Sequence, residues 1–141
     1  MNFVDNSSRR ILSRIRLGRA LHVLVRVPRE ESKRGSIRRE YARRFSNLAD
    51  SIFRIGMEGS TWKAMTLNGL MYSSIYGYDP SDALQALEAG ALGSGLSGTG
   101  PAVAAVFERQ NEAESLARSW AEGGAQVIRT MTSDGGATLG Q

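Results

Sequence analysis

A continuous apolar run at residues 102–107 constrains the fold of this chain more than any other feature. The run is short and follows a stretch rich in glycine, so it predicts a short central strand. A strand that is apolar at every position has to be covered on both faces. The rest of the chain must therefore supply elements that pack against the sheet that contains this strand.

The hydrophobic periodicity elsewhere supplies those elements. Residues 21–27 alternate as expected for a half-buried strand, with His22 opposite the aliphatic side chains, and residues 126–131 predict a last strand. Helical spacing predicts helices over 37–55 and 60–76, a third helix after residue 80 and a fourth after residue 111. The order strand, three helices, strand, helix, strand is typical of an α+β fold with helices packed on one face of a small sheet.

Local signals place the helix ends. Asp79 followed by Pro80 predicts a helix start, because the carboxylate can accept from free amides and proline suits the first turn. Asn111 with Glu114 three residues later resembles a capping box. The glycines at positions 56 and 59 predict the end of the first helix.

Composition excludes several classes of function. The 141 residues include no cysteine, which rules out disulfides, thiolate metal sites and a cysteine nucleophile. His22 is the single histidine, so a centre with several histidines cannot form within one chain. No apolar run is long enough to span a bilayer, and the basic start lacks the pattern of a secretory signal. We therefore expect a soluble cytoplasmic protein with no metal site of its own.

The positive charge of the chain is concentrated at its start. Residues 1–44 hold 13 Lys and Arg against 4 Asp and Glu, a net of +9, whereas residues 45–141 hold 5 against 10, a net of −5. This favours a solvated basic surface, with a phosphate-binding surface as the functional alternative. A nucleic-acid partner is the weaker interpretation, because no aromatic residues interleave with the arginines.

One segment has a composition that packing alone does not explain. Residues 95–102 hold Gly95, Ser97, Gly98, Thr99 and Gly100, and they lead directly into the apolar strand. Glycines let backbone amides converge without obstruction by Cβ atoms, as in loops that wrap an anion. A tight turn between two strands uses the same residues. The segment is not a Walker loop, because no lysine follows the glycines.

Residues 92–102, with the sequence LGSGLSGTGPA, resemble the third motif of the GHMP small-molecule kinases. Residues 63–73, 77–80 and 86–92 resemble the archaeal-type shikimate kinases of that superfamily. The resemblance takes in residues 3–6 and 23–28 as well, so it covers nearly the whole chain. It implies the ferredoxin-like C-terminal domain of a GHMP kinase, with a small antiparallel sheet, at residues 21–132. Residues 1–20 are then an arm or remnant of the preceding domain, and residues 133–141 a glycine-rich tail.

The activity implied by the resemblance is transfer of the γ-phosphoryl group of ATP, with Mg²⁺, to a hydroxyl of shikimate in aromatic amino-acid biosynthesis. In that family a loop of the N-terminal domain holds the nucleotide phosphates and an aspartate of the same domain assists the acceptor hydroxyl. Neither has a matching position here, and Asp5 is not assigned that role. The implied picture is a C-terminal part, inactive alone, whose N-terminal kinase domain is on another chain or lost. Its catalytic residues are therefore unknown.

The resemblance also implies which residues line the cleft. Gly95, Ser97, Gly98, Thr99 and Gly100 would support the phosphate loop and border the substrate. Asn68 and Tyr72 lie one helical turn apart and are weaker candidates, since packing within the helix is the favoured explanation for both.

Two other interpretations stay open at this stage. A different GHMP kinase, of the homoserine or mevalonate type, would share the glycine loop. A non-catalytic ferredoxin-like module would use the exposed domain face to bind a partner.

Overall fold

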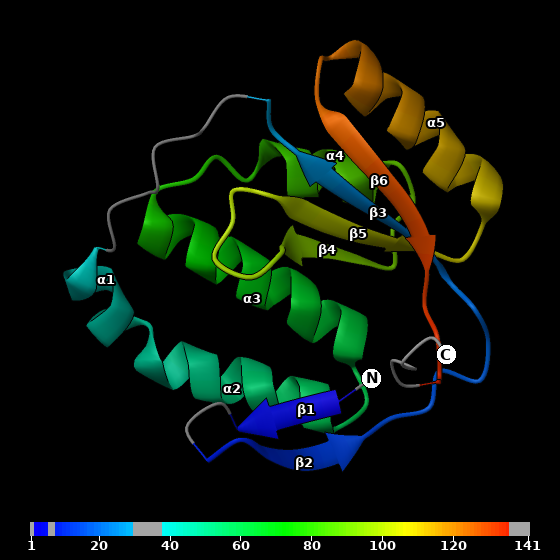
Figure 1. Ribbon diagram of the computed structural model, residues 1–141. Helices are drawn as coiled ribbons and strands as arrows, with labels where there is room; N and C mark the ends of the chain where they lie inside the picture. Colours follow the sequence, from blue (N-terminus) through cyan, green and yellow to red (C-terminus); the bar gives the residue numbers. More distant parts are fainter. Residues whose placement is uncertain (1, 6–7, 30–37, 136–141) are drawn as a thin grey trace, which may run out of the picture.

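The computed structural model describes residues 2–5, 8–29 and 38–135, and its centre is a four-stranded antiparallel sheet (Figure 1). The strands are β3 (His22–Val27), β4 (Gly93–Leu96), β5 (Val103–Phe107) and β6 (Gln126–Met131), in the spatial order β4-β5-β3-β6. Numbered along the chain as one to four, these strands lie in the order 2-3-1-4, which is the ferredoxin-like arrangement. The predicted α+β class is confirmed.

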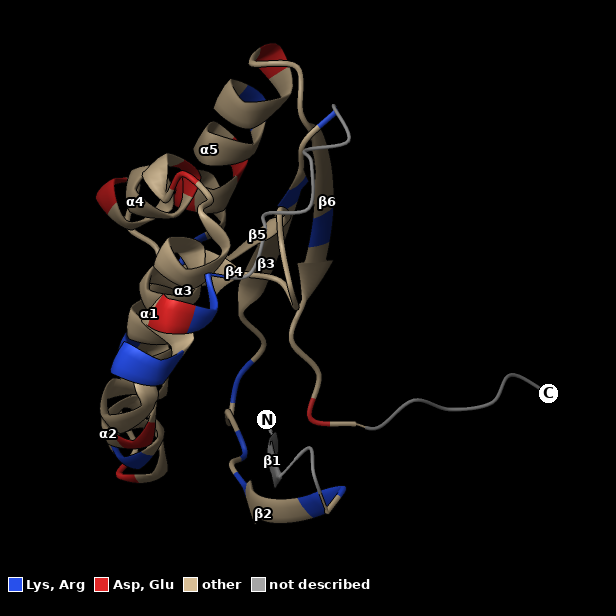
Figure 2. Ribbon diagram, turned by 90° about the vertical axis from the view of Figure 1, so that its left-hand side faces the viewer, with Lys and Arg blue, Asp and Glu red and all other residues tan. Residues whose placement is uncertain are grey.

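The helices lie on one side of the sheet, as Figure 2 shows. They are α1 (Arg39–Arg44), α2 (Ser46–Met57), α3 (Thr61–Tyr76), α4 (Ser81–Glu88) and α5 (Gln110–Glu122). The helix α4 packs on β4 and β5, and α5 packs on β3, β5 and β6, whereas α3 lies along the edge strand β4 and carries α2. None of the described helices is long and apolar enough to cross a membrane.

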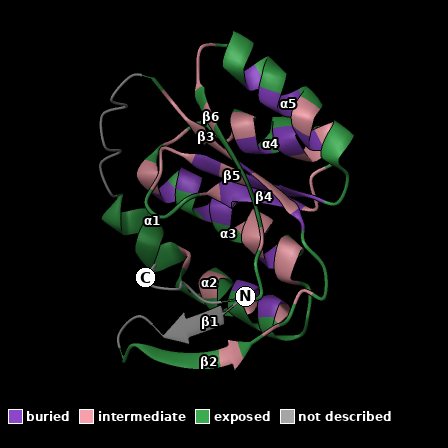
Figure 3. Cartoon of the chain, turned by 45° about the vertical axis from the view of Figure 1, so that its right-hand side comes forward, coloured by how far each residue is buried: buried purple, intermediate pink, exposed green. Residues whose placement is uncertain are grey.

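The buried side chains form two separate clusters (Figure 3). The larger cluster joins the sheet to α4 and α5 around Phe107 and Trp120, both of which are buried. The indole Nε1 of Trp120 donates to Oε1 of Gln85 on α4 at 2.8 Å, so its one polar atom is satisfied. The smaller cluster joins α2 to α3 and is centred on Ile52 and Met71.

Strand β3 buries a different face from the one that its valines suggest. Leu24 is only 2% exposed, whereas Val23 and Val25 are half-buried on the opposite face. The register places Leu24 beside Ala105 and Arg26 beside Val103, so Arg26 shares the helix-facing side. A partly buried arginine needs a counter-charge there.

A seam without intervening side chains joins α3 to β4. A methyl group at Gly69 of α3 would lie 2.4 Å from the Cα of Gly95, and one at Gly93 would lie 2.7 Å from the carbonyl oxygen of Trp62. The helix and strand backbones therefore touch directly, which only glycine allows. This contact fixes the position of β4 and of the bend that follows it.

Three expectations need correction. Strand β4 forms within the glycine-rich stretch, where the sequence predicted no strand, because pairing with β5 and contact with α3 organise it. The helix predicted over 37–55 is two helices joined at Phe45, and Gly56 is a buried residue within α2 rather than its end. Asn111 is not a cap: α5 begins at Gln110 after Arg109, with no side-chain cap.

The helix start after Asp79 is confirmed, since Oδ1 of Asp79 accepts from the amide of Ser81 at 3.0 Å. Lys33, Arg34, Ile37 and residues 136–141 of the predicted tail lie outside the described residues.

Strands β1 (Asn2–Asp5) and β2 (Arg10–Arg14) form an antiparallel hairpin that does not join the main sheet. The hairpin falls within the predicted arm at residues 1–20. Figure 1 places it beyond α2, at the end of the molecule away from α4 and α5.

Candidate functional site

The candidate phosphate loop is an exposed bend, residues 97–101, that connects the paired strands β4 and β5. The amide of Ser97 donates to the carbonyl oxygen of Ala102 at 2.8 Å. The amide of Gly100 donates to the carbonyl oxygen of Ser97 at 3.2 Å. Gly98 and Gly100 have φ of 65° and 73°, and the Gly100–Pro101 peptide is cis. The bend is thus a defined turn that depends on glycine at two positions.

The tip of the bend presents groups suited to an anion. Ser97, Gly98 and Thr99 are all exposed. Within the described part of the chain, the amides of Gly98 and Thr99 have no hydrogen-bond partner. Two adjacent free amides flanked by two hydroxyls are the donor set that phosphate and carboxylate oxygens need.

Gly95 has a different position from the other four predicted cleft residues. It is buried within β4 and faces Gly69 of α3, so its absent side chain serves the seam between helix and strand. The other four residues lie together in or beside the exposed bend.

Gly100 lies directly against an aromatic row that was not predicted from the sequence. A methyl group at Gly100 would lie 2.8 Å from Cε2 of Tyr78. The ring of Tyr78 is 6.0 Å from that of Tyr76, which in turn stacks on Tyr72 at 5.9 Å. Tyr72, one of the two weaker candidates, is therefore linked to the bend through two rings.

Tyr78 also lines a hollow of about 630 Å³ between α1 and the end of α3. On its other side, the guanidinium of Arg38 lies 5.5 Å above the centre of the Tyr41 ring. Tyr78 therefore contacts both this hollow and the bend at Gly100.

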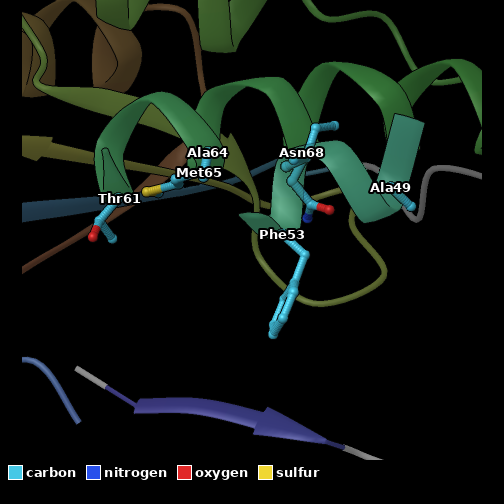
Figure 4. Close-up of a pocket in the computed structure, with 7 residues that line it drawn as sticks. Ala49, Phe53, Thr61, Ala64, Met65 and Asn68 are labelled. Carbon is cyan, nitrogen blue, oxygen red and sulfur yellow. The ribbon is translucent and has the colours of Figure 1, made fainter. Parts of the chain in front are cut away.

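Asn68, the other weaker candidate, lines an apolar groove of about 340 Å³ between α2 and α3. In Figure 4, Asn68 and Phe53 point to the open side of this groove, toward β1. Asn68 is exposed and lies next to Gly69, so it stands beside the seam with β4. The structure does not show Asn68 in contact with the bend.

The described residues hold no group of three or more His, Asp or Glu side chains that could bind one ion. The free amides of the bend do suit a nucleotide phosphate or a substrate carboxylate.

Among the described residues, Asp82 at the start of α4 is the group whose pKa is clearly shifted. Burial raises the pKa of Asp82 above its ordinary value, Arg26 opposes this shift and Asp79 adds to it. Nη1 of Arg26 is 2.6 Å from Oδ2 of Asp82, so this pair ties β3 to α4. Its place in the helix-facing layer indicates a structural role.

The family model described as GHMP kinases C terminal matches residues 63–126. A shikimate kinase from Methanothrix thermoacetophila is 35% identical over 137 residues, covering 97% of this chain and 46% of that protein. A shikimate kinase from Methanothermobacter thermautotrophicus is 36% identical over 116 residues, covering 82% of this chain and 40% of that protein.

Among solved structures, L. major mevalonate kinase in complex with R-mevalonate superposes with a TM-score of 0.53 at 12% identity. The match covers 84% of this chain and 44% of that chain. At this identity the likeness is one of fold. The chain spans about half the length of the curated relatives it matches.

Proposed function

Because residues 63–126 belong to the GHMP kinase C-terminal domain family and the whole chain resembles archaeal shikimate kinases, we propose that it is the C-terminal part of a shikimate kinase. The reaction is transfer of the γ-phosphoryl group of ATP to a hydroxyl of shikimate, giving shikimate 3-phosphate. We propose, as the sequence predicted, that the protein acts in the cytoplasm. The observation that carries the kinase proposal is the exposed bend at residues 97–101 with two amides that have no partner among the described residues.

Phosphoryl transfer asks little covalent chemistry of the protein, because catalysis rests on positioning and on neutralising charge. In this proposal the amides of Gly98 and Thr99 donate to anionic oxygens at the cleft. The hydroxyls of Ser97 and Thr99 border the polyhydroxy carboxylic acid substrate and orient its hydroxyls. ATP supplies the phosphoryl group, and Mg²⁺ supplies further charge neutralisation.

The bend forms only one wall of a site. In the family that this chain resembles, the nucleotide loop and the acid-base group belong to an N-terminal domain, and this chain covers only 46% of the Methanothrix relative. We therefore propose that a complementary N-terminal kinase domain provides the nucleotide loop and the acid-base group. The present chain alone should have no measurable kinase activity, since the remaining groups are absent from it.

The acceptor is supported by the names of the curated relatives. Eight sequence relatives at 29–36% identity are named shikimate kinases. A homoserine or mevalonate acceptor rests on the shared superfamily alone. The alternative from another class of function is a non-catalytic binding module, in which the bend would bind neither nucleotide nor substrate.

A chimera tests the proposal. In it, this chain replaces the matched portion of the Methanothrix relative, and ADP release is measured with ATP, Mg²⁺ and either shikimate, homoserine or mevalonate. We expect ADP release that depends on shikimate, a phosphorylated product by mass spectrometry, and neither from the present chain alone.

The unmodified relative is the positive control, and circular dichroism checks that the chimera folds. A folded chimera that phosphorylates none of the three acceptors would refute the kinase proposal and favour the module. Activity with homoserine or mevalonate alone would refute the shikimate assignment.

A further inference from the structure

Tyr78 lies in the short connection between α3 and α4, and its backbone is fixed on both sides. Gly77 ends α3 with φ of 73°, and the amide of Tyr78 donates to the carbonyl oxygen of Ser73 at 2.9 Å. This is the bond that closes a helix end of the Schellman type. One residue further on, Oδ1 of Asp79 accepts from the amide of Ser81, where α4 begins. The backbone that carries Tyr78 therefore has little freedom to move.

The ring of Tyr78 is held by a neighbouring ring as well. Its centre lies 6.0 Å from the centre of the Tyr76 ring, at an interplanar angle of 44°. Tyr76 in turn stacks on Tyr72, with 5.9 Å between the ring centres. Aromatic rings at such separations attract one another beyond the effect of burial alone. A fixed backbone and a packed ring make Tyr78 a rigid support for whatever lies against it.

The group that lies against this support is Gly100 of the bend. A methyl group at Gly100 would lie 2.8 Å from Cε2 and 3.2 Å from Cδ2 of Tyr78, and 3.2 Å from Cδ2 of Leu96. All three distances are shorter than ordinary van der Waals contact, which begins at 3.4 Å. The backbone of Gly100 is therefore packed closely against both side chains.

The two amides at the tip of the bend depend on this packed point. The amide of Gly100 donates to the carbonyl oxygen of Ser97, so Gly98 and Thr99 are enclosed in a turn that ends at Gly100. Both tip residues are exposed, and no described atom lies within 4 Å of the place where a methyl group at Gly98 would stand. The orientation of the tip is thus set by the ends of the turn rather than by side chains around it.

We propose that Tyr78 is a positioning residue of the phosphoryl-transfer site: its ring holds Gly100, and through Gly100 it keeps the amides of Gly98 and Thr99 in one orientation. The inference rests on the proposed function for the use of those amides. Donors that are oriented in advance stabilise charge without reorganisation during the reaction. A shift of about 1 Å in such groups can cost up to about a hundredfold in rate.

Three substitutions at Tyr78 and one control test this role. Tyr78→Ala removes the support, whereas Tyr78→Phe keeps the ring carbons that face Gly100. Tyr78→Leu keeps apolar bulk without a ring, and it replaces the alanine variant if circular dichroism shows that variant to be unfolded. The matched control is Tyr41→Ala, which removes a 42% exposed ring from the other side of the same hollow, where Tyr41 stacks on Phe45.

The first measurement needs no catalysis and uses the chain alone. Order parameters of the Gly98 and Thr99 amides are measured by ¹⁵N relaxation. We expect values near about 0.85 for the unmodified chain, Tyr78→Phe and Tyr41→Ala, and values below about 0.6 for Tyr78→Ala or Tyr78→Leu. A purely structural role would lower Tm without loosening these two amides selectively.

The second measurement uses the chimera with ATP, Mg²⁺ and shikimate. In it, Tyr78→Ala should lower kcat/KM at least about tenfold and raise the KM for ATP or shikimate at least about threefold, whereas Tyr78→Phe and Tyr41→Ala should stay within about twofold of the unmodified chimera. A smaller folded fraction lowers the apparent kcat and leaves KM unchanged. The rise in KM therefore separates positioning from folding.

Four results would overturn the proposal. These are order parameters that Tyr78→Ala leaves unchanged, a KM that does not rise, an equal loss in Tyr78→Phe, and an equal loss in Tyr41→Ala. The loss in Tyr78→Phe would assign the effect to the hydroxyl instead of the ring. An inactive unmodified chimera would refute the kinase proposal alone, and the order parameters would still decide whether Tyr78 supports the bend.

Discussion

Replacing Gly69 with alanine tests the seam between α3 and β4. The new methyl group would lie 2.4 Å from the Cα of Gly95 and 3.1 Å from the amide nitrogen of Leu96. Ordinary contact begins at 3.4 Å, so the helix and strand backbones must separate by about 1 Å, and no flexible side chain is there to yield. Overpacking of this kind costs about 1–3 kcal/mol.

Alanine also has the better helix propensity, by about 1 kcal/mol, which offsets part of that cost. The net expectation for Gly69→Ala is a loss of up to about 2 kcal/mol in the free energy of unfolding, or a fall in Tm of up to roughly 8 °C for a chain of this size. Urea and thermal unfolding followed by circular dichroism measure both quantities.

The matched control is Gly123→Ala at the end of α5. Gly123 has φ of −69°, and a methyl group there would meet its nearest neighbours at 3.5 Å. This variant should be as stable as the unmodified chain or slightly more stable. If Gly69→Ala behaves like Gly123→Ala, the backbone contact does not limit the packing of α3, and the reasoning fails.

Two further predictions concern the bend and the ion pair. In the chimera, Gly100→Ala should lower kcat/KM at least about tenfold, because a methyl group must displace the Tyr78 ring and strain a residue with φ of 73°. Gly98→Ala is equally strained but has open space around it, so its kcat/KM should fall less. Equal losses of kcat/KM in the two variants would contradict a positioning role for Tyr78. For Asp82, burial raises the pKa despite Arg26, so the folded state binds the proton more tightly than the unfolded chain. The stability that protonated Asp82 contributes is complete below the unfolded pKa of about 3.8 and is lost as the pH rises through the raised pKa. Urea unfolding should therefore show the unmodified chain losing stability relative to Asp82→Asn as the pH rises over that range. A relative gain in stability would show that the ion pair outweighs burial.

Elements with a strong local pattern could be predicted from the sequence. The predicted helix over 60–76 and the predicted strand over 126–131 match α3 and β6 to within a residue. Their periodicity is local, and tertiary packing uses the same faces that the pattern marks. The single helix predicted over 37–55 was interrupted at Phe45 because a continuous apolar stripe does not show where the backbone turns.

Strand β4 could not be predicted in this way. Its sequence, GSGL, has no β-branched or aromatic residue and no apolar alternation. Its extended backbone comes from pairing with β5, and its glycines are explained only by the approach of α3. The buried face of β3 could not be predicted for a similar reason. Arg26 lies on the face toward the helices, and only its ion pair with Asp82, which the strand's own sequence does not show, makes that position tolerable.

The candidate site was predicted in part. The exposed bend lies where the glycine and hydroxyl pattern predicted it, and its role in catalysis stays a prediction. Tyr78 was missed because its contact with Gly100 joins positions far apart in the sequence, and no local pattern marks it. The proline and aspartate that follow Tyr78 drew attention to the helix start instead.

The two buried clusters have no residue in common, and this separation has an evolutionary consequence. Substitutions at sites that share no neighbours add independently, so the helical pair and the sheet layer can each drift without compensating changes in the other. The exception is the glycine seam, where Gly69 and Gly93 have no tolerated alternative that leaves both backbones in place. Across divergent relatives, these glycines should be the slowest positions to change, even though neither contributes a side chain.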